Sequence, residues 1–66
     1  MDNKIRELRE NRGLTQQMLG DSLGVSRQTI ISLENGKYNP SIKLAHDIAK
    51  FFSMKIEDVF IFEEDV

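Results

Sequence analysis

The sequence predicts a small all-α domain built from five short helices. Apolar residues recur at helical spacing, a serine or threonine precedes several of these stretches, and a glycine follows them. A chain of 66 residues buries only a small core, and domains of this size often depend on disulfides, a metal or a partner chain. Because the sequence has no cysteine, disulfides and thiolate metal sites are excluded, and oligomerisation is expected.

Local signals give the expected bounds of each helix. The five helices are expected over residues 3–12, 16–23, 27–35, 42–52 and 56–60. Hydroxyl side chains that can cap a helix precede three of them: Thr15, Ser26 and Ser41. Glycines suited to the left-handed conformation that ends a helix follow three of them: Gly13, Gly24 and Gly36. β-structure is expected at most as a short strand around residues 61 and 62.

The third expected helix has an unusual outer face. With side chains spaced about 100° apart, Ile30 and Leu33 point to one side and should enter the core. The opposite side carries five residues with polar or aliphatic side chains: Arg27, Gln28, Ile31, Ser32 and Asn35. Arginine can bind guanine, glutamine can bind adenine, and an aliphatic group can contact the methyl group of thymine. This face suits the major groove of DNA, although its first two residues alone could be ordinary first-turn helix residues.

The spacing of the second and third helices favours the first interpretation. A tight glycine turn joins these two short helices, and Gly24 in that turn is expected to need a positive φ. Gly20 lies where a larger side chain would hold the two helices apart. Together with the caps and the flanking helices, this spacing predicts a helix-turn-helix over about residues 16–35.

Three segments carry a resemblance to a known family: "LRENRGLTQ", "LGVSRQTIISLENGKYNPS" and "LAHDIAKFF". They resemble the XRE family of small regulators, and the similarity extends over about residues 5–60. The resemblance implies the five-helix, lambda-repressor-like DNA-binding fold of phage Cro and CI repressors, in one domain over residues 1–66. It also implies that a homodimer binds double-stranded DNA at a pseudo-palindromic operator.

The resemblance also implies roles for individual residues. Positions that match base-reading residues of the family are Arg27, Gln28, Ile31 and Ser32. Positions that match contacts to the DNA backbone are Gln16, Ser26, Thr29, Asn35, Lys37, Tyr38 and Asn39. Ile31 departs from the family pattern, which more often has a polar residue there. Arg9 and Glu34 match an ion pair that links the first helix to the recognition helix.

Charge is distributed unevenly along the chain. The net charge is -2, but residues 1–43 contain seven basic and five acidic residues. Residues 44–66 contain two lysines and six acidic residues. One end of the molecule can therefore approach a polyanion, whereas the acidic end should point away from it.

The end of the chain contains four consecutive apolar residues: Val59, Phe60, Ile61 and Phe62. One helix face cannot bury all four, so a second copy of the chain is expected to cover them in a symmetric dimer. The dimerisation tail is expected over about residues 56–66. The alternative is that the tail folds back over its own core.

The remaining side chains do not suggest catalysis. His46 is the only histidine, so a metal site or a catalytic triad is not expected, and no cofactor or small-molecule ligand is implied. No apolar run is long enough for a membrane span, and the N-terminus lacks the apolar block of a signal peptide, so a cytoplasmic protein is expected. The expected function is transcriptional regulation by sequence-specific DNA binding, as a repressor without enzymatic activity. The alternative is an antitoxin-like protein-interaction module with the same fold.

Overall fold

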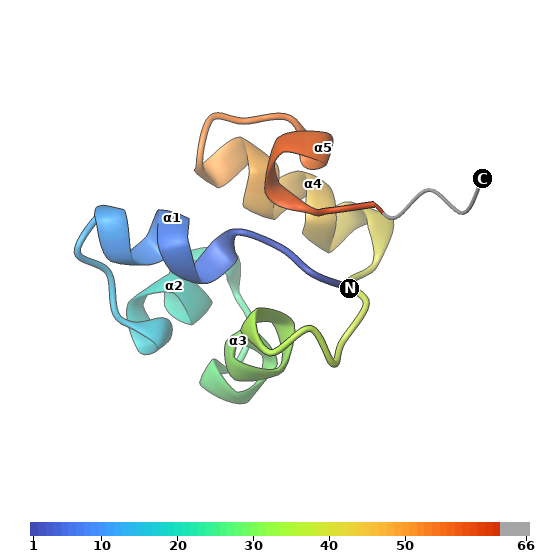
Figure 1. Cartoon of the computed structure of the whole chain (residues 1–66). Coiled ribbons are helices and arrows are strands. Elements are labelled where there is room, and N and C mark those ends of the chain that lie inside the picture. The colour runs from blue at the N-terminus through green and yellow to red at the C-terminus, as the bar shows by residue number, and fades with distance from the viewer. Residues whose placement is uncertain (63–66) are drawn as a thin grey trace.

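Five α-helices form the described part of the chain, residues 1–62, in the computed structural model (Figure 1). The helices are α1 (Ile5–Asn11), α2 (Gln16–Leu23), α3 (Arg27–Glu34), α4 (Ile42–Phe51) and α5 (Ile56–Val59). The predicted all-α class is confirmed, and all five helices lie where the sequence placed them, with ends that differ by one or two residues. In residues 1–62, no helix has the length and apolar character needed to cross a membrane.

The predicted hydroxyl caps are present at α2, α3 and α4. Thr15 Oγ1 accepts a hydrogen bond from Met18 N (3.0 Å), and Ser26 Oγ accepts one from Thr29 N (3.2 Å). Ser41 caps α4 in the same way, through Leu44 N (3.1 Å). Each hydroxyl satisfies a backbone N–H group that has no acceptor inside its own helix.

The core lies where all five helices meet. Its buried apolar residues are Ile5, Leu19, Ile30, Leu33, Ile48, Ala49, Phe52, Val59 and Phe60. Every helix contributes, and the inward direction predicted for Ile30 and Leu33 is confirmed. Burying such side chains contributes about 1.5–3 kcal/mol each before the entropic cost of folding is subtracted. This core fixes one side of α3 and leaves the other side to the surface.

The chain beyond α5 pairs with the N-terminal segment. Phe60 lies opposite Asn3 in an antiparallel bridge, which is flanked by hydrogen bonds from Lys4 N to Val59 O and from Ile61 N to Asp2 O, both 2.8 Å. In residues 1–62 the β-structure is limited to this isolated bridge, next to the position where at most a short strand was expected. The same pairing explains why α1 begins two residues later than expected, since Asn3 is extended.

This pairing also corrects the predicted dimer surface. Val59 and Phe60 are 0% and 2% exposed, so they belong to the core of the chain itself and cannot supply apolar surface to a partner. Ile61 and Phe62 remain 46% and 54% exposed. The last part of the predicted dimerisation tail, residues 63–66, lies outside the described residues.

Candidate nucleic-acid interface

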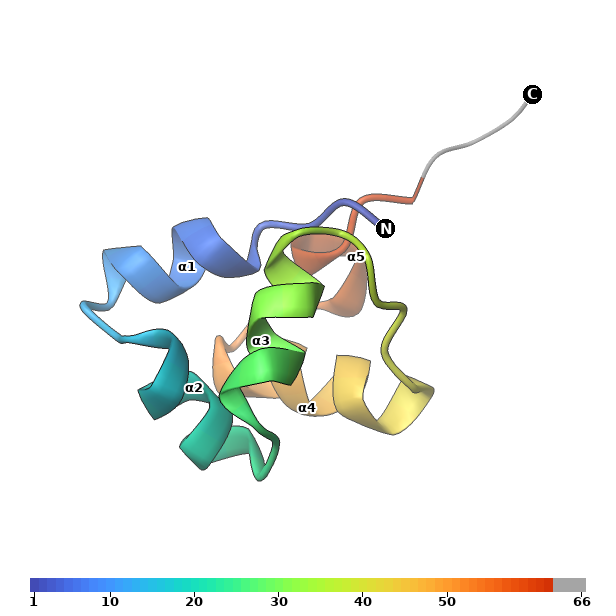
Figure 2. The same cartoon turned by 90° about the horizontal axis from the view of Figure 1, so that it is seen from below.

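A tight turn joins α2 and α3, which pack against each other (Figure 2). Gly24 ends α2 in the left-handed conformation with φ 72°, where a side chain is strained. A Cβ atom on Gly20 would lie 2.8 Å from the carbonyl oxygen of Val25, which is too close for any side chain. The turn therefore requires glycine at both positions, as the sequence predicted.

The first turn of α3 presents the two side chains predicted to contact bases first. Arg27 and Gln28 are exposed, whereas Ile31 and Ser32, one turn further on, are half-buried. All four lie on the side of α3 away from Ile30 and Leu33, which are fully buried. The N-terminal half of the helix is therefore the part that can enter a groove deeply.

Hydroxyl groups at the start of α3 are linked to each other. Ser26 Oγ and Thr29 Oγ1 lie 3.0 Å apart, and Ser26 Oγ also caps the helix. A hydroxyl group has one donor and two acceptor positions, so this pair retains hydrogen-bonding capacity for an external group. Their predicted contact with the DNA backbone is untested and remains a prediction.

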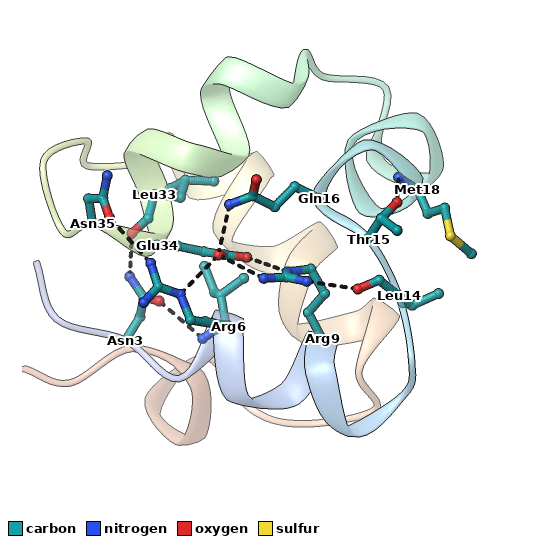
Figure 3. Close-up of polar contacts among 11 residues, drawn as sticks. Asn3, Arg6, Arg9, Leu14, Thr15, Gln16, Met18, Leu33, Glu34 and Asn35 are labelled. Atoms are coloured by element: carbon teal, nitrogen blue, oxygen red, sulfur yellow. Dashed lines mark hydrogen bonds and ion pairs between the residues drawn. The ribbon is translucent and has the colours of Figure 1, made fainter.

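A network of side chains fixes the other end of α3 (Figure 3). The Glu34 side chain is 0% exposed and receives the guanidinium group of Arg9 through two hydrogen bonds, Nε to Oε2 (2.6 Å) and Nη2 to Oε1 (3.2 Å). Arg6 Nε lies 3.4 Å from Oε1 of the same carboxylate. The ion pair implied by the family resemblance is therefore present, with a second arginine added, and both arginines come from α1.

Electrostatics keep this buried carboxylate ionised. Burial would raise the pKa of Glu34, but the hydrogen bonds from Arg9, Gln16 and Arg6 act in the opposite direction and hold that pKa below its ordinary value. The hydrogen bond to Glu34 correspondingly raises the pKa of Arg9. A buried charge that is paired and fully hydrogen-bonded costs far less free energy than an isolated one. The network therefore joins α1, α2 and α3 without leaving an unpaired charge.

Gln16 takes part in this network, which sequence reasoning did not anticipate. Its Nε2 atom donates to Glu34 Oε1 (3.2 Å), so the half-buried side chain predicted to contact phosphate uses a donor on a carboxylate of the protein itself. The first N–H groups of α2 still have no acceptor within the helix and face outward at its N-terminus. The arginine that sequence reasoning missed is Arg6. Its position three residues before Arg9, on the same helix face, was the available signal.

The loop after α3 carries the other residues predicted to contact the DNA backbone. Lys37, Tyr38 and Asn39 are exposed, and Gly36 turns the chain with φ 72°. Lys37 N donates to Ser32 O (3.1 Å), which holds the loop against the last turn of α3. Asn35 is exposed, and its Oδ1 lies 3.4 Å from Arg6 Nη2. The loop thus places a lysine beside the exposed face of α3.

Potential metal ligands do not cluster in the described part of the chain. Among residues 1–62, no group of three or more histidine or acidic side chains is arranged to hold a metal ion. His46 is exposed on α4. The distinguishing feature of the described surface is therefore the exposed first turn of α3 beside the α2–α3 turn.

Two short helices joined by a glycine turn, with the second one exposed along its polar face, define a helix-turn-helix protein. The sequence model of the family described as "Helix-turn-helix" matches residues 5–59. The chain belongs to this family, in its XRE type, which confirms the resemblance noted from the sequence.

Several transcriptional regulators are similar to this chain over most of its length. An uncharacterized HTH-type transcriptional regulator of Methanocaldococcus jannaschii is 60% identical over 65 residues, covering 98% of each chain. The HTH-type transcriptional activator BcrR of Enterococcus faecalis is 38% identical over 96% of this chain and 31% of its own length. The cryptic phage CTXphi transcriptional repressor RstR of Vibrio cholerae is 32% identical over 86% of this chain and 51% of its own length.

Proposed function

We propose that this protein is a sequence-specific DNA-binding transcriptional regulator that acts as a homodimeric repressor at a pseudo-palindromic operator. The observation that carries the proposal is the exposed first turn of α3, where Arg27 and Gln28 extend from a helix whose other side is held by the core. Full-length similarity to an HTH-type transcriptional regulator supports this role. The relatives include both a transcriptional activator and a transcriptional repressor. We propose repression because occupying an operator is by itself enough to block transcription.

The proposed contacts divide into two groups. Arg27, Gln28, Ile31 and Ser32 would contact base edges in the major groove, where arginine and glutamine distinguish guanine and adenine. The residues proposed to contact the DNA backbone are Gln16, Ser26, Thr29, Asn35, Lys37, Tyr38 and Asn39. For Gln16 we assign this contact to its backbone N–H at the start of α2, since its side-chain amide donates to Glu34.

The dimer is proposed to form on the side of the molecule that carries the chain beyond α5. Ile61 and Phe62 are exposed there, and Ile42 at the start of α4, which lines the same hollow as Phe62, is 87% exposed. Ile42, Phe62 and Pro40 line an apolar hollow of about 180 Å³ on this side. Clustered exposed apolar side chains on a small protein mark an interaction surface. Ile42 was not among the residues predicted from the sequence, because it is the first residue of its helix.

Selection of bound DNA from a random library tests the proposed function. The wild-type protein should enrich a two-fold symmetric sequence, and Gln28→Ala should weaken binding to it by about 1–3 kcal/mol while relaxing preference at one base step. Gln17→Ala is the matched control, because Gln17 lies on α2 and pairs with Asp21 (2.9 Å). Equal weakening on operator and random DNA would assign Gln28 to the DNA backbone. Enrichment of no sequence, with stable capture of a second protein, would favour the antitoxin-like alternative.

A second experiment tests the dimer surface. Ile42→Glu and Ile61→Glu should each place a charge in the interface, giving folded monomers in sedimentation and much weaker operator binding. His46→Glu, which also adds an acid to the exposed surface of α4, should remain dimeric. Dimers that persist in both isoleucine variants would show that the two-fold contact lies elsewhere.

A further inference from the structure

We propose that Asn3 is a positioning residue for DNA recognition, which fixes the direction of α3 relative to the dimer surface. This inference rests on the proposed function, since it concerns how two recognition helices are set at a fixed separation. Asn3 lies in the extended segment before α1 and is not among the residues predicted to contact DNA.

The Asn3 side chain joins α1 and α3 (Figure 3). Its Nδ2 atom donates to the carbonyl oxygen of Leu33 in the last turn of α3 (2.7 Å). Its Oδ1 atom accepts from the backbone N–H of Ile5, the first residue of α1 (3.0 Å). One short amide group therefore satisfies the first N–H of α1 and adds a second hydrogen bond to a carbonyl in the last turn of α3, which also accepts from Gly36 N (3.0 Å).

The backbone on both sides of Asn3 is held by the segment after α5. The hydrogen bonds of Lys4 N with Val59 O and of Ile61 N with Asp2 O flank the bridge between Asn3 and Phe60. Phe60 is 2% exposed, so this part of the tail is fixed in the core. The N-terminal segment consequently runs between the end of α3 and the tail that continues into Ile61 and Phe62 (Figure 1).

The hydrogen bond of Asn3 with Leu33 lies at the C-terminal end of α3, so it can set the direction in which the N-terminal end of the helix points. Arg27 and Leu33 are six residues apart, which is about 9 Å along a helix. A rotation of α3 by about 10° around its C-terminal end would therefore move the reading end by about 1.5 Å. In a dimer joined through the tail, such a movement changes the separation of two helices that must meet grooves about 34 Å apart.

The test compares binding to DNA of different half-site spacing. The first probe is the operator selected by the wild type, and the second is the same operator with one base pair inserted between its half-sites. That insertion rotates one half-site by roughly 35° relative to the other. Asn3→Ser keeps a short acceptor near Ile5 N but stops short of Leu33. Asn11→Ser, at the exposed C-terminal end of α1, is the matched control.

Loss of the hydrogen bond to Leu33 should mainly reduce the preference for the operator with the original half-site spacing over the one with the inserted base pair. The ratio of affinities for the two probes should fall by about fivefold in Asn3→Ser, because a loosened α3 fits wrongly spaced DNA with less distortion of the duplex. Binding to a single half-site and the dimer fraction should stay close to wild type. Asn11→Ser should keep the wild-type ratio.

Two outcomes would overturn the inference and one would remove its basis. An unchanged ratio in Asn3→Ser would show that Asn3 does not position α3. Equal weakening on both probes, in proportion to a loss of folded protein, would show a purely structural role, and thermal unfolding of the same sample detects this. If the wild type itself selects no spaced operator, the proposed function fails and this inference fails with it.

Discussion

The two ends of α3 differ in how the rest of the chain holds them. At the C-terminal end, Glu34 is enclosed by Arg9, Arg6 and Gln16, and the Leu33 carbonyl is bound by Asn3. At the N-terminal end, the cap from Ser26 is the local support, and within residues 1–62 the side chains of Arg27 and Gln28 have no hydrogen-bond partner. One helix thus separates stability from recognition: side chains at one end are used to fix it, and those at the other end remain available to a ligand.

We call the C-terminal end of α3 the fixed end and its N-terminal end the open end. The largest effect is expected from removing one partner of the ion pair at the fixed end. Glu34→Ala would leave Arg9 buried without its partner, which should lower the free energy of unfolding by about 3–5 kcal/mol. Chemical denaturation measures this change. Asp21→Ala is the control, because it removes an exposed acidic side chain; it should change the free energy of unfolding by less than about 0.5 kcal/mol.

Removing both charges together separates the cost of an unpaired charge from the value of the pair. Arg9→Met with Glu34→Leu should be more stable than either single variant, because apolar side chains of similar volume replace a desolvated ion pair. Single losses that add up to the double loss would mean that the two side chains do not interact energetically.

The helix caps and the buried side of α3 show which parts of the structure the sequence can predict. The caps at Thr15 and Ser26 and the glycine at position 24 were predictable because each acts within four residues of its own position. The burial of Ile30 and Leu33 was predictable from helical spacing, since a helix has one side facing the core. Local chemistry thus specified the elements and the outward face of α3.

Contacts between distant segments were not predictable in the same way. The pairing of Asn3 with Phe60 joins residues at opposite ends of the chain, and nothing local in "VFIF" distinguishes a buried residue from an exposed one. The prediction for the dimer surface therefore failed for Val59 and Phe60. The hydrogen bond of Gln16 with Glu34 was missed for the same reason, because an amide side chain fits a phosphate contact and an internal one equally well.

Acid should weaken the fixed end progressively. The folded protein holds the pKa of Glu34 below its ordinary value of 4.5, so the stabilisation from this carboxylate is fully present above that pH. As the pH falls below it, the unfolded chain takes up the proton first, and the free energy of unfolding decreases until the pH passes the lower pKa of the folded state.

Glu34→Gln tests this sign directly. The variant should be less stable than the wild type at neutral pH, and its stability should fall less between about pH 5 and pH 3, because the titrating group is gone. Urea titrations at several pH values measure both quantities. Glu57→Gln, at an exposed position of α5, should retain the wild-type acid dependence. If the free energy of unfolding of Glu34→Gln falls with pH as steeply as that of the wild type, the acid sensitivity belongs to other carboxylates.

A smaller effect is expected from removing the support at the open end. Ser26→Ala deletes the hydroxyl that accepts from Thr29 N, which should cost about 1 kcal/mol of stability. Operator binding should weaken beyond that loss if the hydroxyl also contacts DNA. Ser22→Ala, at an exposed position within α2, should leave stability unchanged or slightly raised, since alanine is the better helix former.

The smallest effect on stability is expected at Lys37, just beyond the fixed end. Its side chain is exposed, so Lys37→Ala should change the free energy of unfolding by less than about 0.5 kcal/mol. If Lys37 contacts phosphate, the variant should bind all DNA sequences more weakly to the same extent, and the slope of log affinity against log salt should fall by about one unit. Lys50→Ala, an exposed lysine in the last turn of α4, should leave that slope unchanged. A slope that is equal in Lys37→Ala and wild type would exclude Lys37 from the contacts with phosphate.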